Sequence, residues 1–594
     1  MTWADKIFKE WGKESLKTIV ENPYKLVEIR GIGFVTADKI AHKVMKQIPL
    51  EYRITACMKF VIEENTWGES NLCMPYSELK KGVVGIIAEC DEELENETDA
   101  PAILKIIPVC LKNNLKLFGA IKDKSDGQVY VYLSKILDRE RFIAKQIWAR
   151  KEFDNKNKEC LDSEINDAER NISQYNNRNI TLDETQKLAI KSAFEHKITI
   201  ITGGGGTGKS TICRAIFYLA QKKGLSIRMM SPTGKAAQVL SEKTGCGAST
   251  VHRSLNIKPG EDEPKNIITE DILVCDESSM NGIDIMYAIF SAMQNNLWGN
   301  IVFVGDKNQL PSVSPGNFLS DMIASGVINV VTLDRVHRQD ENSYIAVLAN
   351  EISKGKVIAI PKEANDIEWF NVNPDSFKDD LLNFLDSYLA NGGEMDDLQI
   401  ISPMKKGLCG VYRVNELIQA EMAQRNNQVD NFVQRGFSKF HVGDRVIQIV
   451  NNYDKMIFNG DMGTITEVGE KARDSSVSDR HEKFVVVNFY GEEMTYYGED
   501  IDELHLAWGI TVHKFQGSQS KNVLFIMAGE AQIMMNKELV YTAFTRAEKM
   551  LYIMGHSAML RIAPTKSAVR KRYTNLIKFI EECKLGQKHF DVLG

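Results

Sequence analysis

The stretch ITIITGGGGTGKST, Ile198–Thr211, has the residue types and spacing of a phosphate-binding loop. Its glycine run Gly203–Ser210 fits the pattern G-x-x-x-x-G-K-[ST], with an apolar run before it and a helical pattern after it. In such loops the backbone amides and the following helix N-terminus attract phosphate oxygens. We expect Lys209 to reach the β- and γ-phosphates and Ser210 to place its hydroxyl on Mg²⁺. A flexible linker is the alternative, but a linker needs neither the preceding strand nor the following Lys-Ser.

The residues of this loop predicted to bind the nucleotide are Gly203, Gly204, Gly205, Gly206, Thr207, Gly208, Lys209, Ser210 and Thr211.

Polar side chains follow two further apolar runs. In DILVCDESSM four apolar residues precede Asp276 and Glu277, and in IVFVGDKNQLPSV an apolar run precedes a loop that contains Gln309. We expect Asp276 to hold the magnesium shell and Glu277 to orient or deprotonate the attacking water. Gln309 would reach the γ-phosphate and its water. Acidic pairs are usually solvated surface, but not at the end of a buried strand. The phosphate loop, this acidic pair and the Gln309 loop together predict an Mg-ATP or Mg-GTP hydrolase.

Two arginines outside the loop indicate what kind of hydrolase this is. Arg338 lies in RVHRQ, at the end of the first unit, and Arg546 lies in VYTAFTRAEK, in the second. An arginine finger stabilises charge on the phosphoryl group in transfer and accelerates hydrolysis by orders of magnitude. If both arginines point at the nucleotide, it lies between two domains, and hydrolysis would open and close their cleft, as in a motor. Each arginine taken alone is as readily explained by a surface ion pair.

The elements that must position these residues follow an α/β pattern. From residue 180 to about 336, short β-rich runs alternate with helical patterns, which is typical of a parallel sheet with crossover helices. A second unit of this kind begins near residue 343. Two period-2 stretches within it predict a small antiparallel β insertion at about 461–501. The first unit is expected at 180–342 and the second at 343–594.

The N-terminal part reads as helical. We expect a helical domain over residues 1–150, and at 22–45 a helix, a tight turn at Gly31-Ile32-Gly33 and a second helix. The amides of Gly31 and Gly33 would bind a phosphate, or this is a structural hairpin. A polar, Asn-rich segment at 151–179 predicts a linker.

Composition restricts the compartment and the partners. No apolar run approaches the roughly 20 residues that a membrane span needs, and the N-terminus lacks the apolar centre of a signal peptide. Ten cysteines occur without a C-x-x-C pair, which predicts a reducing, cytoplasmic compartment and no zinc site. Because the net charge is -7, basic contacts to a nucleic acid would be confined to a groove.

The order of motifs resembles that of superfamily-1 DNA helicases, and more narrowly the stand-alone RecD-like family. The resemblance covers Leu182 to about Gly555, and residues 22–41 resemble that family's helix-hairpin-helix region. It rests on GGGGTGKST, SPTGKAA, STVHRSL, VCDESSM, GDKNQLPSV, RVHRQ, AWGITVHKFQGSQ and VYTAFTRA. It implies two RecA-like motor domains, an SH3-like β insertion, and 5′→3′ movement along single-stranded DNA.

The resemblance also implies roles for further residues. Gln186 would read adenine, and Gly517 would link a DNA-contacting loop to ATP. Residues 255–269 lie where the family has a hairpin that splits the duplex, although an acidic surface loop is the alternative. Asn451 and Asn452 are explained nearly as well by turns. The residues implied to contact DNA are Thr233, Lys235, Thr250, His252, Asn451, Asn452, Thr511, His513 and Lys514.

The function that fits these features is an ATP-dependent DNA helicase that acts on single-stranded DNA and on junctions of single- and double-stranded DNA, with Mg²⁺ as cofactor. Its direction follows from the resemblance alone. An RNA helicase, or a translocase that does not unwind, is the alternative. A P-loop kinase would need no Arg546 unit, and a non-catalytic protein would not need Lys209 and Glu277. We expect no membrane partner, and a monomer.

Overall fold

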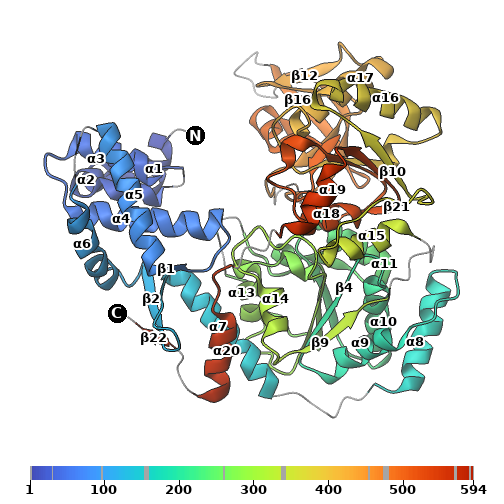
Figure 1. Cartoon of the computed structure of the whole chain (residues 1–594), viewed down its shortest axis with the longest axis horizontal. Coiled ribbons are helices and arrows are strands. Elements are labelled where there is room, and N and C mark those ends of the chain that lie inside the picture. Colours follow the sequence, from blue (N-terminus) through green and yellow to red (C-terminus); the bar gives the residue numbers. More distant parts are fainter. Residues whose placement is uncertain are drawn as a thin grey trace.

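The computed structural model describes residues 3–29, 31–94, 96, 98–152, 160–258, 261, 263–335, 343–452, 455, 457–472, 481–567, 572–586 and 590–592. Arg338 lies in the interval 336–342, outside the described residues. Figure 1 shows three masses: the helical N-terminal part and two α/β units, one above the other in that view. The two parallel sheets, the helical N-terminal part and the β insertion confirm the predicted α/β fold class.

The first α/β unit is a parallel sheet covered by helices on both faces. Two apolar clusters form its core, one on each side of strands that are buried throughout. This burial explains why the strands read as continuous apolar runs. In sheet order the strands are β6 (Ala248–Thr250), β5 (Ile227–Ser231), β7 (Ile272–Cys275), β8 (Asn300–Gly305), β4 (Ile198–Gly203) and β9 (Asn329–Leu333). The helices include α9 (Glu184–Glu195), α10 (Lys209–Lys222), α11 (Gly234–Thr244), α12 (Val251–Ser254), α13 (Ile283–Ala292) and α14 (Phe318–Ala324).

The second α/β unit repeats this plan with a five-stranded parallel sheet. Apolar clusters again lie on both faces of the sheet. In sheet order the strands are β10 (Ile367–Asn371), β21 (Ala547–Gly555), β20 (Ser520–Met527), β11 (Leu398–Ser402) and β19 (Gly509–Thr511). The helices include α15 (Tyr344–Ser353), α16 (Phe377–Ala390), α17 (Val411–Arg425), α18 (Lys537–Phe544) and α19 (Ala558–Ile562).

The β insertion is an antiparallel sheet with its own small core. It extends beyond the predicted 461–501, because one strand, β14, comes from before that segment and another, β18, from after it. Its strands are β17 (Glu492–Tyr497), β16 (His481–Phe489), β15 (Met462–Ala472), β14 (Arg445–Gln448) and β18 (Leu504–Leu506). A separate hairpin of β12 (Phe432–Arg435) and β13 (Ser438–His441) precedes it.

The N-terminal part is mainly helical, as expected, but it also contains a small antiparallel sheet that was not predicted. Gly31, with a φ of +96°, makes the predicted tight turn, although a 3₁₀-helix, η2 (Pro23–Glu28), precedes it. The sheet is β1 (Met74–Pro75), β3 (Val129–Leu133), β2 (Phe118–Asp123) and β22 (Phe590–Val592). The helices are α1 (Trp3–Trp11), α2 (Ser15–Glu21), α3 (Phe34–Val44), α4 (Leu50–Glu63), α5 (Tyr76–Leu94), α6 (Ala100–Asn113) and α7 (Ser134–Glu152).

The predicted linker at 151–179 is largely a packed helix, α8 (Asp162–Tyr175). Ile165, Ala168 and Ile172 are buried against the first α/β unit, where Tyr218 of α10 donates a hydrogen bond to Asp167 (3.0 Å). The helical spacing of these apolar residues outweighs the polar composition that suggested a linker.

Two further features concern the helices and the cysteines. None of the helices in the part of the chain that the structure describes is both long and apolar enough to cross a membrane. All ten cysteines are free thiols, and nine of them are buried.

Candidate nucleotide and DNA sites

The predicted phosphate loop connects β4 to α10 at the carboxyl edge of the first sheet. Gly206 and Gly208 have φ values of +81° and +87°, which side-chain-bearing residues rarely adopt. A Cβ atom on Gly208 would lie 2.3 Å from Nε2 of Gln186, so glycine is also needed there for space. Lys209 begins α10, and its Nζ donates hydrogen bonds to the carbonyls of Gly203 (2.7 Å) and Gly204 (2.8 Å). The predicted lysine therefore points into the loop, and half-buried Ser210 and Thr211 follow it on the helix.

Gln186, the predicted adenine reader, lies on α9 beside this loop. Its Nε2 donates to the carbonyl of Thr207 (3.1 Å), and its Oε1 accepts from the amide of Asp183 (3.1 Å). The side chain is 3% exposed. Gln186 thus supports the loop in this structure, and one of these bonds must open for its amide to read a base.

Asp276 and Glu277 follow β7, close to the loop in the sheet order. Burial and the adjacent Glu277 carboxylate raise the pKa of Asp276 to about 6, while Lys209 acts in the opposite direction. Glu277 has a φ of +50°, an uncommon conformation for a residue that carries a side chain. The Asp276 carboxylate and the Ser210 hydroxyl are hard oxygen ligands, and Mg²⁺ is commonly held by one or two carboxylates together with substrate phosphates. These residues fit a magnesium ion that is shared with a nucleotide.

Gln309 lies after β8, together with an acidic residue that the sequence analysis did not single out. Asp306 is 1% exposed, and its Oδ2 accepts hydrogen bonds from Tyr541 Oη (2.7 Å) and Gln309 Nε2 (3.3 Å). Gln309 Oε1 is buried and has no hydrogen-bond partner among the described residues. A buried carbonyl oxygen without a donor is costly, so this oxygen is available to a donor that enters the site.

The second unit contacts the phosphate loop directly through α18. The hydroxyl of Tyr541 lies against the phosphate loop, because a Cβ atom on Gly204 would lie 2.9 Å from that hydroxyl. A Cβ atom on Gly205 would lie 3.3 Å from Cβ of Thr545. The glycine run is therefore needed for the close approach of α18 as well as for its amides.

Arg546 lies next to this contact but is held by its own unit. It is 2% exposed, and its guanidinium donates to the carbonyls of Ser518 (3.0 Å) and Thr542 (3.2 Å) and to Thr545 Oγ1 (3.3 Å). Reaching a nucleotide would require some of these bonds to break. The nucleotide contact of Arg546 stays a prediction.

A loop of the first sheet and two segments of the second meet at Leu310. Its amide donates to Thr542 Oγ1 (2.9 Å), and its carbonyl accepts from Gln516 Nε2 (3.0 Å). Gly517 follows Gln516, and a Cβ atom on Gly517 would lie 3.3 Å from Thr233 Oγ1 of the first unit. The residues implied to link ATP to DNA thus lie between the two units, beside a predicted DNA contact.

The DNA residues predicted in the first unit lie at helix starts. Thr233 caps α11 by accepting from the amide of Ala236 (3.3 Å), and Thr250 caps α12 by accepting from Arg253 (3.2 Å). Both hydroxyls thus have structural roles as helix caps. Lys235 Nζ lies 5.2 Å from the ring centre of Tyr490, in the β insertion.

His252 is half-buried on α12. Burial lowers its pKa, and the carboxylate of Asp284 on α13 acts in the opposite direction. His252 is therefore a neutral hydrogen-bonding group near neutral pH.

The predicted DNA residues of the second unit belong to a basic cluster, which we define as Lys405, His505, His513 and Lys514. Burial and Lys405 lower the pKa of both His513 and Lys514, and burial, Lys514 and Lys405 lower that of His505. Thr511 Oγ1 accepts from the amide of Lys514 (3.3 Å). Lys405 and His505 were missed by the sequence analysis, but Lys405-Lys406 follows the buried strand LQIIS, where site residues gather in parallel sheets.

Asn451 and Asn452 hold a turn beside the β insertion. Asn451 Oδ1 accepts from the amide of Asn459 (2.8 Å), Asn452 Oδ1 accepts from Lys455 (3.0 Å), and Asn452 Nδ2 donates to Glu503 (3.0 Å). These contacts favour the turn-forming alternative for both residues.

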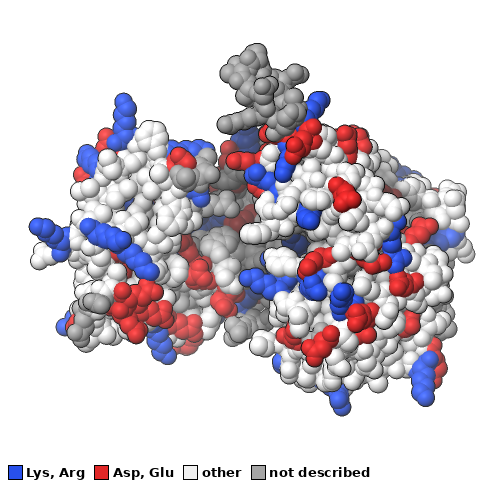
Figure 2. All heavy atoms as spheres, turned by 90° about the horizontal axis from the view of Figure 1, so that it is seen from above, with Lys and Arg blue, Asp and Glu red and all other residues white. Residues whose placement is uncertain are grey.

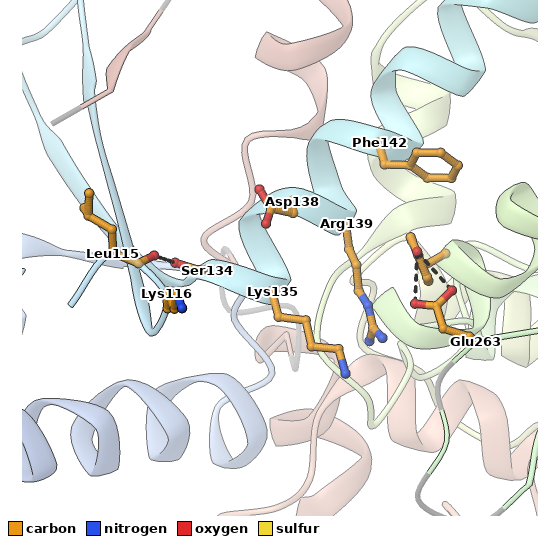
Figure 3. Close-up of a pocket in the computed structure, with 9 residues that line it drawn as sticks. Leu115, Lys116, Ser134, Lys135, Asp138, Arg139, Phe142 and Glu263 are labelled. Carbon is orange, nitrogen blue, oxygen red and sulfur yellow. Dashed lines mark hydrogen bonds between the residues drawn. The ribbon is translucent and has the colours of Figure 1, made fainter. Parts of the chain in front are cut away.

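Residues 255–269 contain no strand among the positions that the structure describes there. The carboxylate of Glu263 accepts hydrogen bonds from Tyr287 of α13 (3.1 and 3.2 Å). As Figure 3 shows, Glu263 and Arg139 of α7 face a common cavity of about 510 Å³ between α7, α13 and this loop. Arg139 pairs with Asp284 and lies 4.7 Å over the Tyr287 ring. The described part of the loop is thus anchored on α13.

Comparison with known families gives four matches along the chain. The ATP-dependent RecD2 DNA helicase HHH domain matches residues 1–72 and the AAA domain matches 181–371. The ATP-dependent RecD-like DNA helicase SH3 domain matches 414–489, and the UvrD-like helicase C-terminal domain matches 506–554. Their order confirms the predicted resemblance.

The chain is also similar to individual proteins. The chain is 27% identical over 567 residues to the ATP-dependent RecD2 DNA helicase of Deinococcus radiodurans, covering 95% of this chain and 74% of that protein. It is 27% identical to the RecBCD enzyme subunit RecD of Mycolicibacterium smegmatis, covering 65% of this chain and 73% of that protein. A crystal structure of Pif1 helicase from Bacteroides with ADP-AlF3 and ssDNA is 19% identical, with a TM-score of 0.40, covering 69% of this chain and 99% of that one.

Proposed function

The chain belongs to the RecD-like family of helicases, and on this premise we propose that it is an ATP-dependent DNA helicase that moves along single-stranded DNA and unwinds duplexes. The observation that carries the proposal is the contact between the two α/β units at the phosphate loop. Tyr541 and Thr545 of the second unit touch Gly204 and Gly205 of the first, next to Arg546. A nucleotide at this loop lies at the interface, so its binding and hydrolysis change how the two units pack.

ATP binding and hydrolysis are assigned to the first sheet. Lys209 and the loop amides bind the β- and γ-phosphates, and Ser210 and Asp276 would hold Mg²⁺. The ion would supply positive charge that offsets the negative charge developing on the phosphate oxygens. Glu277 orients the attacking water and accepts its proton. Gln309 lies on the loop that the second unit contacts through Leu310, so its position depends on how the two units pack.

Arg546 of the second unit supplies a positive charge that stabilises the negative charge on the γ-phosphate during hydrolysis. Its guanidinium leaves the carbonyls of Thr542 and Ser518 and turns toward the γ-phosphate as the interface closes around ATP. Arg338 is assigned the same task from the end of the first unit.

Single-stranded DNA is assigned to residues at the carboxyl edges of the two sheets. The basic cluster of the second unit and the helix starts at Thr233 and Thr250 in the first would hold the phosphate backbone without reading sequence. Basic and acidic side chains are interspersed on the face shown in Figure 2, and neither sign covers it alone. A confined basic cluster therefore fits this chain better than a broad basic surface. The 5′→3′ direction and the choice of DNA over RNA follow from the family.

We assign the two motor domains to residues of about 180–342 and 343–567, with the β insertion in the second. The segment 160–179 packs with the first motor domain. The described residues 572–586 and 590–592 pack against the N-terminal domain, and Leu576, Phe579 and Ile580 also lie in an apolar cluster of the first motor domain.

The experiment that tests the proposal is unwinding of duplexes with a single-stranded 5′ tail or 3′ tail, with ATP and Mg²⁺. The wild-type chain should separate the 5′-tailed duplex, and Lys209→Ala should abolish both unwinding and ATP hydrolysis while it still binds the single strand. Preference for the 3′ tail would overturn the direction. DNA-stimulated hydrolysis by Lys209→Ala would overturn the site. Hydrolysis without strand separation would favour a translocase, and separation of RNA duplexes alone an RNA helicase.

A further inference from the structure

The end of the chain crosses back from the second motor domain to the N-terminal domain. We call its described residues, 572–586 and 590–592, the C-terminal strap. It contains α20 (Leu576–Leu585), which packs along α7, and β22, which pairs antiparallel with β2 so that Val592 lies opposite Ile121. Figure 1 shows α20 beside α7 and β22 beside β2, far from the rest of the second motor domain. The strap therefore joins the last part of the chain to the first.

At its start, the strap contacts the loop that follows the catalytic candidate Gln309. Arg572 donates from its guanidinium to the carbonyls of Ser312 (2.7 Å) and Gly316 (2.5 Å), and also to Ser312 Oγ (3.3 Å). Arg572 is half-buried, and Ser312 is 3% exposed. A fork of donors on carbonyls of the same loop fixes the spacing of those carbonyls in a way that a single point charge does not.

The N-terminal domain holds the same loop from another side. Ser70 accepts from the amide of Gly316 (3.1 Å), and its hydroxyl donates to the carbonyl of Val313 (2.8 Å). At the other end of the loop, Leu310 is bonded to Thr542 and Gln516 of the second motor domain. The loop from 306 to 316 is thus anchored by the second motor domain at one end, and by Arg572 and Ser70 at the other.

The strap is well fixed on the N-terminal domain, so it can serve as an anchor. The carbonyl of Tyr573 accepts from the amide of Leu72 (2.9 Å), and its hydroxyl donates to Glu78 (3.0 Å). The amide of Asn575 donates to the buried carboxyl of Glu140 (2.7 Å). These bonds tie the residues directly after Arg572 to α5, α7 and the segment before β1.

We propose that Arg572 is a positioning residue for ATP hydrolysis, which acts through the carbonyls of Ser312 and Gly316 to hold Gln309 at the γ-phosphate. This inference rests on the proposed function. Because Ser312 lies three residues after Gln309, a shift of the loop at Ser312 moves the Gln309 side chain, whereas the phosphate loop, on another connection of the sheet, stays in place. Arg572 therefore affects the chemical step and leaves ATP binding unchanged.

The test is steady-state ATP hydrolysis by the full chain with saturating single-stranded DNA. Arg572→Ala should lower kcat by on the order of 10-fold, because small displacements of a positioning group cost one to two orders of magnitude in rate, while KM for ATP stays within about two-fold. Arg572→Lys keeps the charge but loses the fork, and should lower kcat to an intermediate value with an unchanged Tm. If Arg572→Ala does not fold, the kcat of Arg572→Lys tests the inference instead.

Tyr573→Phe is the matched control. It removes the hydroxyl bond to Glu78 from the neighbouring strap residue but leaves the loop contacts intact, so kcat should equal that of the wild type. Wild-type kcat in both Arg572 variants would overturn the inference. An equal loss of kcat in Tyr573→Phe would also overturn it, because any weakening of the strap would then suffice. Absence of DNA-stimulated hydrolysis in the wild-type chain would instead reject the proposed function.

Discussion

The two parallel sheets share one architecture, but their carboxyl edges carry different chemistry. The edge of the first sheet carries the glycine loop with Lys209 and three carboxylates, Asp276, Glu277 and Asp306. The edge of the second carries hydroxyls and cations, among them the basic cluster, Thr545 and Arg546. The surfaces that meet at the interface are therefore complementary and not duplicates.

This difference indicates a division of labour. A phosphate site needs backbone amides at close range, which the glycines of the first sheet provide, together with oxygen ligands for a metal ion. The loop after β11 in the second sheet has Lys405-Lys406 and lacks the run of four glycines. We infer that the first sheet performs hydrolysis, and that the second detects the nucleotide through Tyr541 and Arg546 and holds DNA.

The largest effect on this comparison is expected from Arg546→Ala. If the second sheet supplies the charge that stabilises the transition state, kcat for ATP hydrolysis should fall by about three orders of magnitude or more, with ATP binding retained. The measurement is DNA-stimulated ATP hydrolysis together with equilibrium binding of a fluorescent ATP analogue.

Arg435→Ala is the matched control, since Arg435 is a half-exposed arginine of the second motor domain whose guanidinium pairs with Asp502 (2.8 Å). It should retain wild-type hydrolysis. A near-wild-type rate in Arg546→Ala would show that the second sheet contributes no catalytic charge, and the two edges would then differ only in DNA contacts.

A smaller effect is expected from Tyr541→Phe, which removes the hydroxyl that joins the two edges. Burial and the Asp306 carboxylate raise the pKa of Tyr541, so this group is a neutral hydroxyl that donates to Asp306 and lies against the phosphate loop at Gly204. A bound phosphate would have to displace this hydroxyl from the loop. Because a typical hydrogen bond contributes about 0.5–1.5 kcal/mol, KM for ATP should fall by about two- to ten-fold in the variant.

Tyr388→Phe provides the comparison for this change. Its hydroxyl donates to the carbonyl of Glu394 within the second motor domain (3.1 Å), so KM should not change. A rise in KM for Tyr541→Phe would mean that the hydroxyl binds the nucleotide instead of competing with it.

The sequence predicted the chemistry of the first edge better than that of the second. The phosphate loop and Asp276-Glu277 are each contained in one strand and the loop after it, so their pattern is local. The contact between Tyr541 and Asp306 joins residues 235 positions apart, and that between Arg572 and Gly316 joins residues 256 apart. Such contacts depend on how two sheets pack, which periodicity does not reveal.

The secondary structure, too, could be predicted only where its sequence pattern is local. The long apolar strands of both parallel sheets could be predicted, because burial on two faces makes them apolar throughout. The N-terminal sheet was missed, since β1 has two residues and β22 comes from the far end of the chain. By contrast, α8 could have been predicted from the sequence, because Ile165, Ala168 and Ile172 have helical spacing. The polar composition of the segment suggested a linker instead.

The smallest effect concerns the pH dependence of DNA binding by the second edge. Burial and Lys405 lower the pKa of His513 below its usual 6.5, so this side chain is neutral at pH 7.5 and gains a proton only in more acidic solution. A bound phosphate favours the protonated form, so protons and DNA bind cooperatively. Affinity for single-stranded DNA at constant salt should therefore rise as the pH falls through this lowered pKa. One such ion pair corresponds to about a two- to five-fold change in affinity.

His513→Gln should lose most of this rise, whereas His556→Gln, at an exposed position after β21, should retain it. Equal pH profiles for all three proteins would place His513 away from the DNA and leave Lys405 and Lys514 as the contacts of this edge.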